Sequence, residues 1–515
     1  MRKRKFFLRS RLSACALLLL LSGCHHATLN DPNTVTVLIE SSPTSLDPRV
    51  GVDAQSEHID MLIFDALVKK DAHFNLLPDL ATSWEIPDPR TYIFHLRDDV
   101  KFHNGQPLTS RDVRWTLDTM RNGTLITPKA SAFASIASME TPDAHTLILH
   151  LQYPDAALLW NLSDGAIGIV PYGSGRDFQQ HPIGTGAFRF VRQDVDKEVI
   201  LESNPSAWNG VPAIHRLRFE VVPDAMTRAL ELHKGSADVA SNTFPADLTW
   251  SLRRDSHLVV TSVPGNNVQY LTLNLRDPYL RHRCVRQAIA VAINRPLIIQ
   301  ALLRGEARPA DSLLPPQHWA YQGSAADSTY DPEHAQQLLQ QAGFAPDKNG
   351  IRFHLSMKTS TDETVRLLAI VLQQQLRQVG IALDIQSYEF ATFFSDISQG
   401  RFGIYSMHWI GGNEDPDIFH YAFASASVPP HGANRGYYSN GKVDALLAQA
   451  QQQINIADRR AAYAQVQQIL ARDLPVIPLW YLDSVIVYNR RITGVVISPS
   501  GTFDFLRHVA IRPQP

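Results

Sequence analysis

Residues 351–385 read IRFHLSMKTSTDETVRLLAIVLQQQLRQVGIALDI, and this stretch decides the fold class. Apolar side chains alternate through its first seven residues, which predicts a strand. A helical pattern follows from about Thr361 to Val379 and ends at Gly380, and the last five residues alternate again. A strand, a helix and a strand with short connections form a βαβ unit, which implies a parallel sheet flanked by helices. The sequence therefore predicts an α/β fold.

The chain on either side of this unit carries similar signals. Asp331 is a good N-cap and Pro332 suits the first helical position, so a helix should precede the unit and end near Gly343. Two late amphipathic helices are expected around 443–450 and 462–470, and the first strand is expected at 35–39.

The N-terminus has the order of a secretory leader. Its first eleven residues contain six Lys or Arg and no acid, and an apolar run then leads to Leu21-Ser22-Gly23-Cys24. The run is about half of the roughly 20 residues that a membrane-spanning helix needs. Leu-Ser-Gly-Cys resembles the bacterial lipobox, which implies that Cys24 becomes a lipidated N-terminus. We expect a signal peptide at 1–23 and an anchor to a bacterial membrane, periplasm-facing in a Gram-negative cell.

Composition excludes several classes of protein. The 492 residues from Cys24 onward are too many for one core and suggest two or more domains. Without the six basic leader residues, 42 basic residues face 50 acids, a net charge of −8, which argues against nucleic acid as a partner. Cys15 leaves with the leader and Cys24 takes lipid, so Cys284 has no partner for a disulfide within the mature chain.

Motifs of catalysis and of cofactor binding do not stand out. Gly184-Thr185-Gly186 begins like a dinucleotide loop, but Arg189 stands where the third glycine should be. The 20 histidines form no HExxH, and Cys284 lies on a predicted amphipathic helix. The sequence therefore predicts no catalytic residue, no metal site and no cofactor, although a metal site built from distant histidines remains open.

Eight short motifs follow one another along the mature chain. They are LATSWE (80–85), YIFHLR (92–97), VKFHNG (100–105), LTSRDV (108–113), PIGTG (182–186), VRQAI (285–289), YDPE (330–333) and PVIPLW (475–480). Their order resembles that of the family 5 bacterial extracellular solute-binding proteins, the peptide, nickel and oligosaccharide receptors of ABC importers. We expect most of these residues to be structural: Trp84, Phe94 and Phe102 in the core, Asn104-Gly105 in a turn and Asp112 as a local cap.

The resemblance implies a two-lobed periplasmic-binding-protein-like fold of type II with an extra subdomain in lobe I. The expected parts are a signal peptide at 1–23, a lipidated tether at 24–34, lobe I at 35–265 with the subdomain at about 57–182, lobe II at 266–474, and a return to lobe I at 475–515. The solute should lie between the lobes, because hinge closure buries it from both sides.

The loop WIGGNEDPD, residues 409–417, follows a strand-like run and combines an aromatic ring, glycines and acids. In peptide-binding family members, this loop supplies an aspartate for the free amine of the peptide, and the equivalent position here is Gly412. Glu414 or Asp417 could replace that acid, or both could cap turns. The predicted solute-binding residues are Ser45, Tyr270, Trp409, Gly411, Gly412, Asn413, Glu414, Asp415, Asp417, Asn434 and Tyr437.

We therefore expect a monomeric lipoprotein that captures a small solute and delivers it to an ABC permease and its ATPase. The family makes a peptide the first candidate, and an oligosaccharide, a metal chelate or another organic solute the alternative. A binding module without transport, or an exported enzyme, remains as a further alternative.

Overall fold

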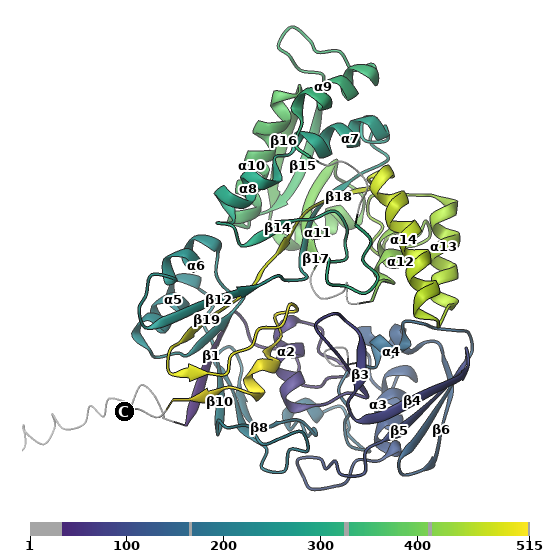
Figure 1. Cartoon of the computed structure of the whole chain (residues 1–515), viewed down its shortest axis with the longest axis vertical. Helices are drawn as coiled ribbons and strands as arrows, with labels where there is room; N and C mark the ends of the chain where they lie inside the picture. The colour runs from purple at the N-terminus through teal and green to yellow at the C-terminus, as the bar shows by residue number, and fades with distance from the viewer. Residues whose placement is uncertain (1–32, 164–166, 324–328, 410–414, 513–515) are drawn as a thin grey trace, which may run out of the picture.

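The computed structural model describes residues 33–163, 167–323, 329–409 and 415–512, and three large sheets organise them. A six-stranded sheet and its helices lie at the top of Figure 1, a seven-stranded sheet at the lower left and a four-stranded sheet at the lower right. We call the part built on the seven-stranded sheet lobe I, the part built on the four-stranded sheet the subdomain, and the part built on the six-stranded sheet lobe II. The predicted α/β class is confirmed.

Lobe I combines the first and last segments of the chain. Its sheet has the order β12-β19-β11-β1-β10-β9-β8. The strands are β1 (Thr34–Ile39), β8 (Phe188–Asp194), β9 (Glu198–Ser203), β10 (Arg216–Val221), β11 (Val239–Ser241), β12 (Leu258–Val263) and β19 (Ser484–Asn489). The helices and short strands around it are α2 (Ala54–Ile63), α5 (Ala225–Lys234), α6 (Ala246–Leu252), η2 (Phe178–Gln180), η3 (Phe503–Arg507), β20 (Ile492–Thr493) and β21 (Ala510–Ile511).

The subdomain is an antiparallel sheet of order β4-β5-β7-β6 with helices packed on it. Its elements are β2 (Val68–Lys70), β3 (Leu76–Pro78), β4 (Ala81–Asp88), β5 (Thr91–Leu96), β6 (Ile136–Asp143), β7 (Thr146–Leu151), α3 (Ser110–Arg121), α4 (Leu158–Asn161) and η1 (Pro128–Phe133). Phe94 and Phe102 are buried and Trp84 packs against the same core. Asp112 closes a capping box with Thr109 at the start of α3, as expected for a local cap.

Lobe II contains the predicted βαβ unit. Its sheet has the order β14-β18-β13-β17-β15-β16. The strands are β13 (Val268–Leu273), β14 (Ala307–Pro309), β15 (Phe353–Ser360), β16 (Ile381–Tyr388), β17 (Ile404–Trp409) and β18 (Val476–Leu482). The helices are α7 (Arg283–Ala292), α8 (Arg295–Leu302), α9 (Pro332–Gln341), α10 (Glu363–Gln378), α11 (Phe390–Ser398), α12 (Ile418–Phe423), α13 (Gly441–Gln452) and α14 (Ile456–Asp473). Strands β15 and β16 pair in parallel on either side of α10, which confirms the prediction.

Two helix starts show why the local prediction succeeded. The Asp331 carboxylate accepts a hydrogen bond from the His334 amide at 2.8 Å, and that of Asp362 accepts one from Val365 at 2.9 Å. Each side chain satisfies an amide that the first turn of a helix leaves unpaired. The boundaries were therefore encoded within a few residues of the chain.

Two of the family motifs meet in space near the end of α2. The Nδ1 atom of His103 accepts a hydrogen bond from the Gly184 amide at 3.2 Å, and its Nε2 lies 3.1 Å from the Gly186 carbonyl oxygen. A Cβ atom added to Gly184 would lie 1.9 Å from the Ile63 carbonyl oxygen, so only glycine fits against α2. Because a carbonyl only accepts, His103 is neutral with its proton on Nε2.

His103 should make the stability of the protein depend on pH. Burial lowers its pKa to about 4, below the usual value of about 6.5. Protonation would place an N–H on Nδ1 facing the Gly184 amide, so the folded state binds fewer protons than the unfolded state. We expect the free energy of unfolding to fall as the pH drops from about 6.5 to about 4, by at most roughly 1.4 kcal/mol per pH unit for this group.

Replacing His103→Gln should reduce this loss over the same pH range. Denaturant unfolding at several pH values measures it, with His181→Gln at an exposed position as the control. Equal pH slopes for His103→Gln and the wild type would contradict the assignment.

Candidate functional site

The lobes face each other at the edges where the chain passes between them. Val263, the last residue of β12, pairs with Ser484 at the start of β19, and Val268, the first residue of β13, pairs with Trp409 at the end of β17. Strands β15 and β17 are parallel, so their carboxyl ends meet at that edge of lobe II. Ligands of open α/β sheets bind outside the carboxyl ends of strands. The edge that contains Trp409 is therefore the candidate site.

Three of the predicted residues lie together at this place. Tyr270, Trp409 and Asn434 line one small pocket of about 20 Å³, which is room for about one water molecule. The rings of Tyr270 and Trp409 are 6.2 Å apart, and the ring of Tyr421 lies 6.1 Å from Trp409. Tyr421 is 47% exposed and Trp409 is partly exposed, so these two rings offer an aromatic surface to a solute, with the buried Tyr270 behind them. We call Tyr270, Trp409 and Tyr421 the aromatic wall.

The hydroxyl groups of Tyr270, in the aromatic wall, and of Tyr405, next to it, are neutral. Tyr270 is buried, and burial with the nearby Tyr405 raises the pKa of its hydroxyl well above the usual value. Burial also raises the pKa of Tyr405, while Arg435 beside it favours the charged form. The Arg435 guanidinium lies 5.0 Å from the centre of the Phe394 ring. These side chains provide hydrogen-bond donors and one cation next to the aromatic rings.

Sequence reasoning missed Tyr405, Tyr421, Phe394 and Arg435. A signal for Tyr405 was present, because it precedes Trp409 by four residues in one strand and so shares its face. The other three residues come from α11, from α12 and from the loop before α13. Nothing local in the sequence marks them, since only the tertiary fold brings these segments to β17.

Asp415 and Asp417 are used by lobe II itself. Arg459 on α14 donates to both carboxylate oxygens of Asp415, at 3.1 and 3.2 Å. The side-chain amide of Gln451 donates to Asp417 at 3.2 Å. Burial, and to a smaller extent the charge of Asp415, raises the pKa of Asp417. Both side chains therefore hold the start of α12 against α13 and α14 in this structure.

The remaining predicted residues have local partners. The Asn434 side-chain amide, buried, donates to the carbonyls of Ala424 and Tyr438 at 3.0 and 2.8 Å, which fixes the loop between α12 and α13. Tyr437 has a φ of 57° and packs under the guanidinium of Arg276 at 3.2 Å.

Ser45 lies in lobe I and donates to Gln179 at 3.0 Å. Five predicted residues, Cys24, Gly411, Gly412, Asn413 and Glu414, lie outside the described residues.

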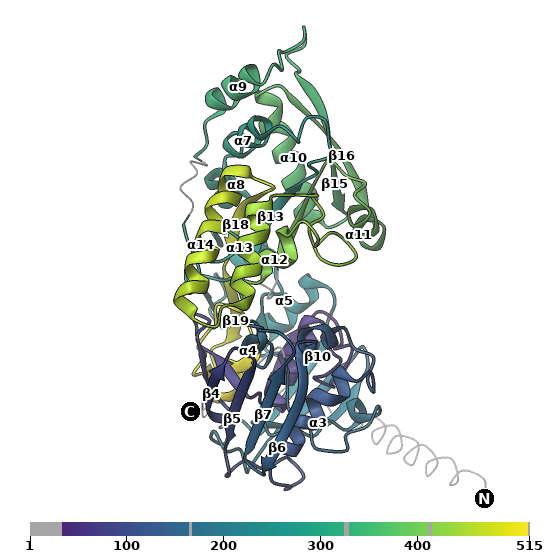
Figure 2. The same cartoon turned by 90° about the vertical axis from the view of Figure 1, so that its right-hand side faces the viewer.

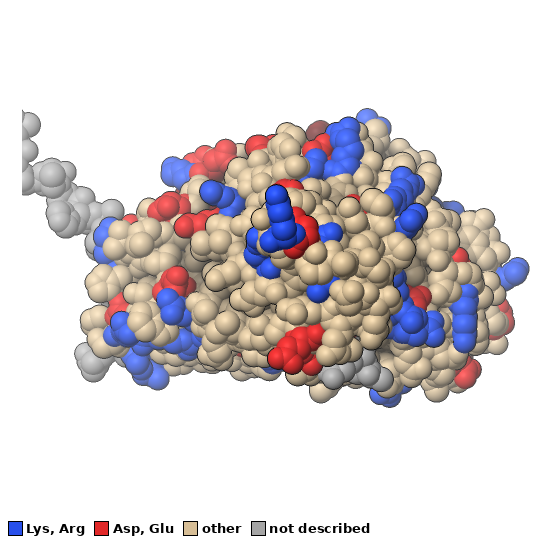
Figure 3. Space-filling view, turned by 90° about the horizontal axis from the view of Figure 1, so that it is seen from above, with Lys and Arg blue, Asp and Glu red and all other residues tan. Residues whose placement is uncertain are grey.

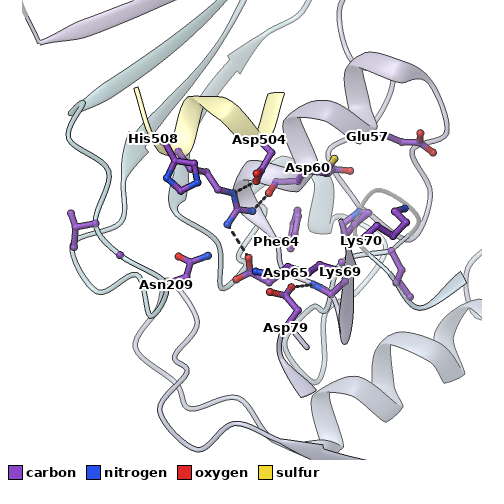
Figure 4. A pocket seen from close by; sticks show the side chains of 18 of the residues that line it. Glu57, Asp60, Phe64, Asp65, Lys69, Lys70, Asp79, Asn209, Asp504 and His508 are labelled. Atoms are coloured by element: carbon purple, nitrogen blue, oxygen red, sulfur yellow. Dashed lines mark hydrogen bonds and ion pairs between the residues drawn. The ribbon is translucent and has the colours of Figure 1, made fainter. Parts of the chain in front are cut away.

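A larger cavity of about 290 Å³ lies between lobe I and the subdomain, bounded by α2, η3 and the β2–β3 hairpin (Figure 4). Arg507 on η3 forms ion pairs there with Asp65 at 3.2 Å and with Asp504 at 2.8 Å. Asp65 also accepts hydrogen bonds from Thr185 and Trp208, each at 2.9 Å. These contacts tie the C-terminal segment to lobe I, and none of the predicted solute residues lines this cavity.

The described part of the chain offers no metal site that could compete with this one, and the face seen from the lobe II end shows no large patch of one charge. Seen from the lobe II end, Lys and Arg are interspersed with Asp and Glu among neutral residues (Figure 3). Across the described ranges, no group of three or more His, Cys, Asp or Glu side chains is arranged to hold a metal ion. Within the same ranges, no helix is both long and apolar enough to span a bilayer.

Comparison with known proteins shows which family this chain resembles. The model of the bacterial extracellular solute-binding proteins, family 5, matches residues 75–429. Di/tripeptide-binding protein 1 of Pseudomonas aeruginosa is 28% identical over 90% of this chain and 92% of its own length. Heme-binding protein A of Haemophilus influenzae is 27% identical over 96% of this chain and 97% of its own length.

A solved structure agrees with these relatives. NikZ of Campylobacter jejuni, crystallised with Ni(L-His), superposes with a TM-score of 0.79 and 26% identity over 93% of this chain and 100% of that one. The two-lobed fold implied by the sequence motifs is thereby confirmed. The chain belongs to the family 5 bacterial extracellular solute-binding proteins.

Proposed function

We propose that this protein captures a short peptide between its two lobes and delivers it to an ABC permease with its ATPase. The observation that carries the proposal is the aromatic wall at the carboxyl edge of lobe II, next to the connections that join the lobes. Aromatic rings give a solute a large apolar contact with little loss of side-chain freedom. The role is that of a receptor and not of an enzyme.

Support for a peptide comes from relatives named for di- and tripeptides. Gly412 stands where peptide-binding family members have an aspartate that pairs with the amine of the peptide. The carboxylates of Asp415 and Asp417 already accept hydrogen bonds from Arg459 and Gln451 within lobe II. A buried ammonium without a partner is costly, so a peptide would bind through Glu414 or through groups other than its free amine. A metal chelate or heme, named for other relatives, is the alternative solute.

The leader and Leu21-Ser22-Gly23-Cys24 support export and lipid anchoring at Cys24. Several acyl chains hold a soluble domain on a membrane durably, at about 0.8 kcal/mol per buried CH₂. The receptor would then bind its solute at a membrane surface, either that of the membrane that holds the permease or that of the opposite membrane.

Trp409→Ala should weaken solute binding. Truncating a central aromatic anchor typically costs about 2 kcal/mol or more, which is roughly a 30-fold rise in Kd. Calorimetry with the solute identified by mass spectrometry in the purified protein measures the change. Trp115→Ala, a partly buried tryptophan on α3 of the subdomain, is the matched control and should leave Kd unchanged. An unchanged Kd for Trp409→Ala would remove the aromatic wall from the site.

Gly412→Asp should strengthen the binding of dipeptides with a free amine, because it restores the carboxylate of the peptide-binding relatives. Calorimetry of the wild type and the variant against a dipeptide library, Ni(L-His) and heme measures this, with acetylated dipeptides as the control. If no peptide binds to either protein and the chelate or heme does, the peptide proposal is wrong.

Cys24 should carry the lipid in the protein isolated from bacterial membranes. Intact-mass analysis should show an N-terminus at Cys24 with the added mass of acyl chains, and Cys24→Ser should release the protein from the membrane fraction. An unmodified Cys24, or cleavage at another residue, would contradict this expectation.

A further inference from the structure

The lobes also touch at a third place, away from the two chain connections. The Ala156 amide in the subdomain donates to the Gln451 carbonyl at the end of α13, at 3.1 Å. Trp160 of α4 lies 5.8 Å from Trp319 of lobe II, measured between ring centres. In Figure 1 the lower ends of α13 and α14 meet the subdomain beside α4, and Figure 2 shows the same neighbourhood.

Arg459 on α14 is the centre of this contact. Its side chain is 1% exposed, and its guanidinium lies 5.1 Å from the ring centre of Trp160 and 5.6 Å from that of Trp319. The guanidinium also donates to the Ala156 carbonyl at 3.4 Å, across the boundary between the subdomain and lobe II. One cation therefore contacts aromatic rings and a backbone group from both parts.

The same guanidinium holds the start of α12. It pairs with both oxygens of Asp415, and Asp415 in turn accepts a hydrogen bond from the Asp417 amide at 2.7 Å. Helix α12 carries Tyr421, which contacts Trp409, and Phe423, which lines the same pocket. One short helix therefore links the Arg459–Asp415 pair to the aromatic wall.

We propose that Arg459 is a positioning residue that couples the contact between the lobes to the arrangement of the aromatic wall. The guanidinium has a fixed planar fork, so it can serve Asp415 and Ala156 at once only while these two groups keep their spacing. This inference rests on the proposed function for its biological meaning. In Figure 2 the contact lies on the side of β18 and β19, opposite α11, so the lobes can open on the other side while it persists.

Distances between spin labels test the coupling without any solute. The mature chain with Cys24→Ser and Cys284→Ser is labelled at Tyr153→Cys and Gln452→Cys, two exposed positions on either side of the contact. We expect one narrow distance distribution, which Arg459→Met broadens toward longer distances. Arg460→Met, at the next and exposed position of α14, is the matched control and should leave the distribution narrow.

Arg459→Lys separates coupling from simple loss of structure. It keeps the charge beside Asp415, but one ammonium cannot pair with Asp415 and reach Ala156 as a guanidinium does. We expect a broadened label distribution together with faster hydrogen exchange in 418–423, while a reference label pair within lobe II, at Gln337→Cys and Gln452→Cys, stays unchanged.

An unchanged distance across the contact in Arg459→Met or Arg459→Lys would overturn the proposal, as would faster exchange in α12 without that change. Failure of peptides, chelates and heme to bind would bear on the proposed function and not on these distances.

Discussion

The two connections between the lobes are packed against each other, and the rest of the architecture depends on that contact. Residues 264–267 lead from β12 to β13, and Asp483 alone separates β18 from β19. A Cβ atom on Gly265 would lie 2.3 Å from the Leu482 carbonyl oxygen, so the close approach requires glycine. The Leu482 amide donates to the Asn267 carbonyl at 2.8 Å. Because the two connections are short and hydrogen-bonded to each other, they form a hinge about which the lobes can rotate. The edge of lobe II that contains Trp409 lies next to this hinge.

The parts of the fold that were predictable are those whose causes are local. Asp331 and Asp362 cap helices through amides three residues away, and period-two patterns marked β15 and β16. The aromatic wall is different, because Tyr270 comes from β13 and Tyr421 from α12, which lies about 150 residues later in the chain. Their proximity follows from strand order and helix packing, which no short motif records. Sequence reasoning therefore named Trp409 and Tyr270, which lie together in the structure, but not the residues that pack around them.

The acids beside the wall show how a local signal can support two readings. From the sequence, an acid in the run EDPD could bind a solute, or these acids could hold the local structure. Arg459 and Gln451, which decide how Asp415 and Asp417 are used here, lie 44 and 34 residues away in sequence. Gly412 alone is informative without a structure, since a glycine cannot supply the carboxylate. The family fold is shared by relatives named for peptides and for heme, so the fold alone does not set the solute.

The polar contacts between the lobes differ in how strongly water and salt screen them. Beside the connections, Arg304 pairs with Asp247 and Arg253 with Glu306, and three of these four side chains are 36% exposed or more. Exposed pairs typically contribute about 0–1 kcal/mol, because water and salt screen them. Arg459 is different, because its ion-pair partner Asp415 lies in the same lobe, so rotation of the lobes leaves that pair intact. Its contacts across the boundary are a hydrogen bond to the Ala156 carbonyl at 3.4 Å and the ring of Trp160 at 5.1 Å, and the side chain is buried. Buried charges are screened much less than exposed ones. The exposed pairs can therefore exchange as the lobes rotate, whereas the contact at Arg459 should be the more persistent one.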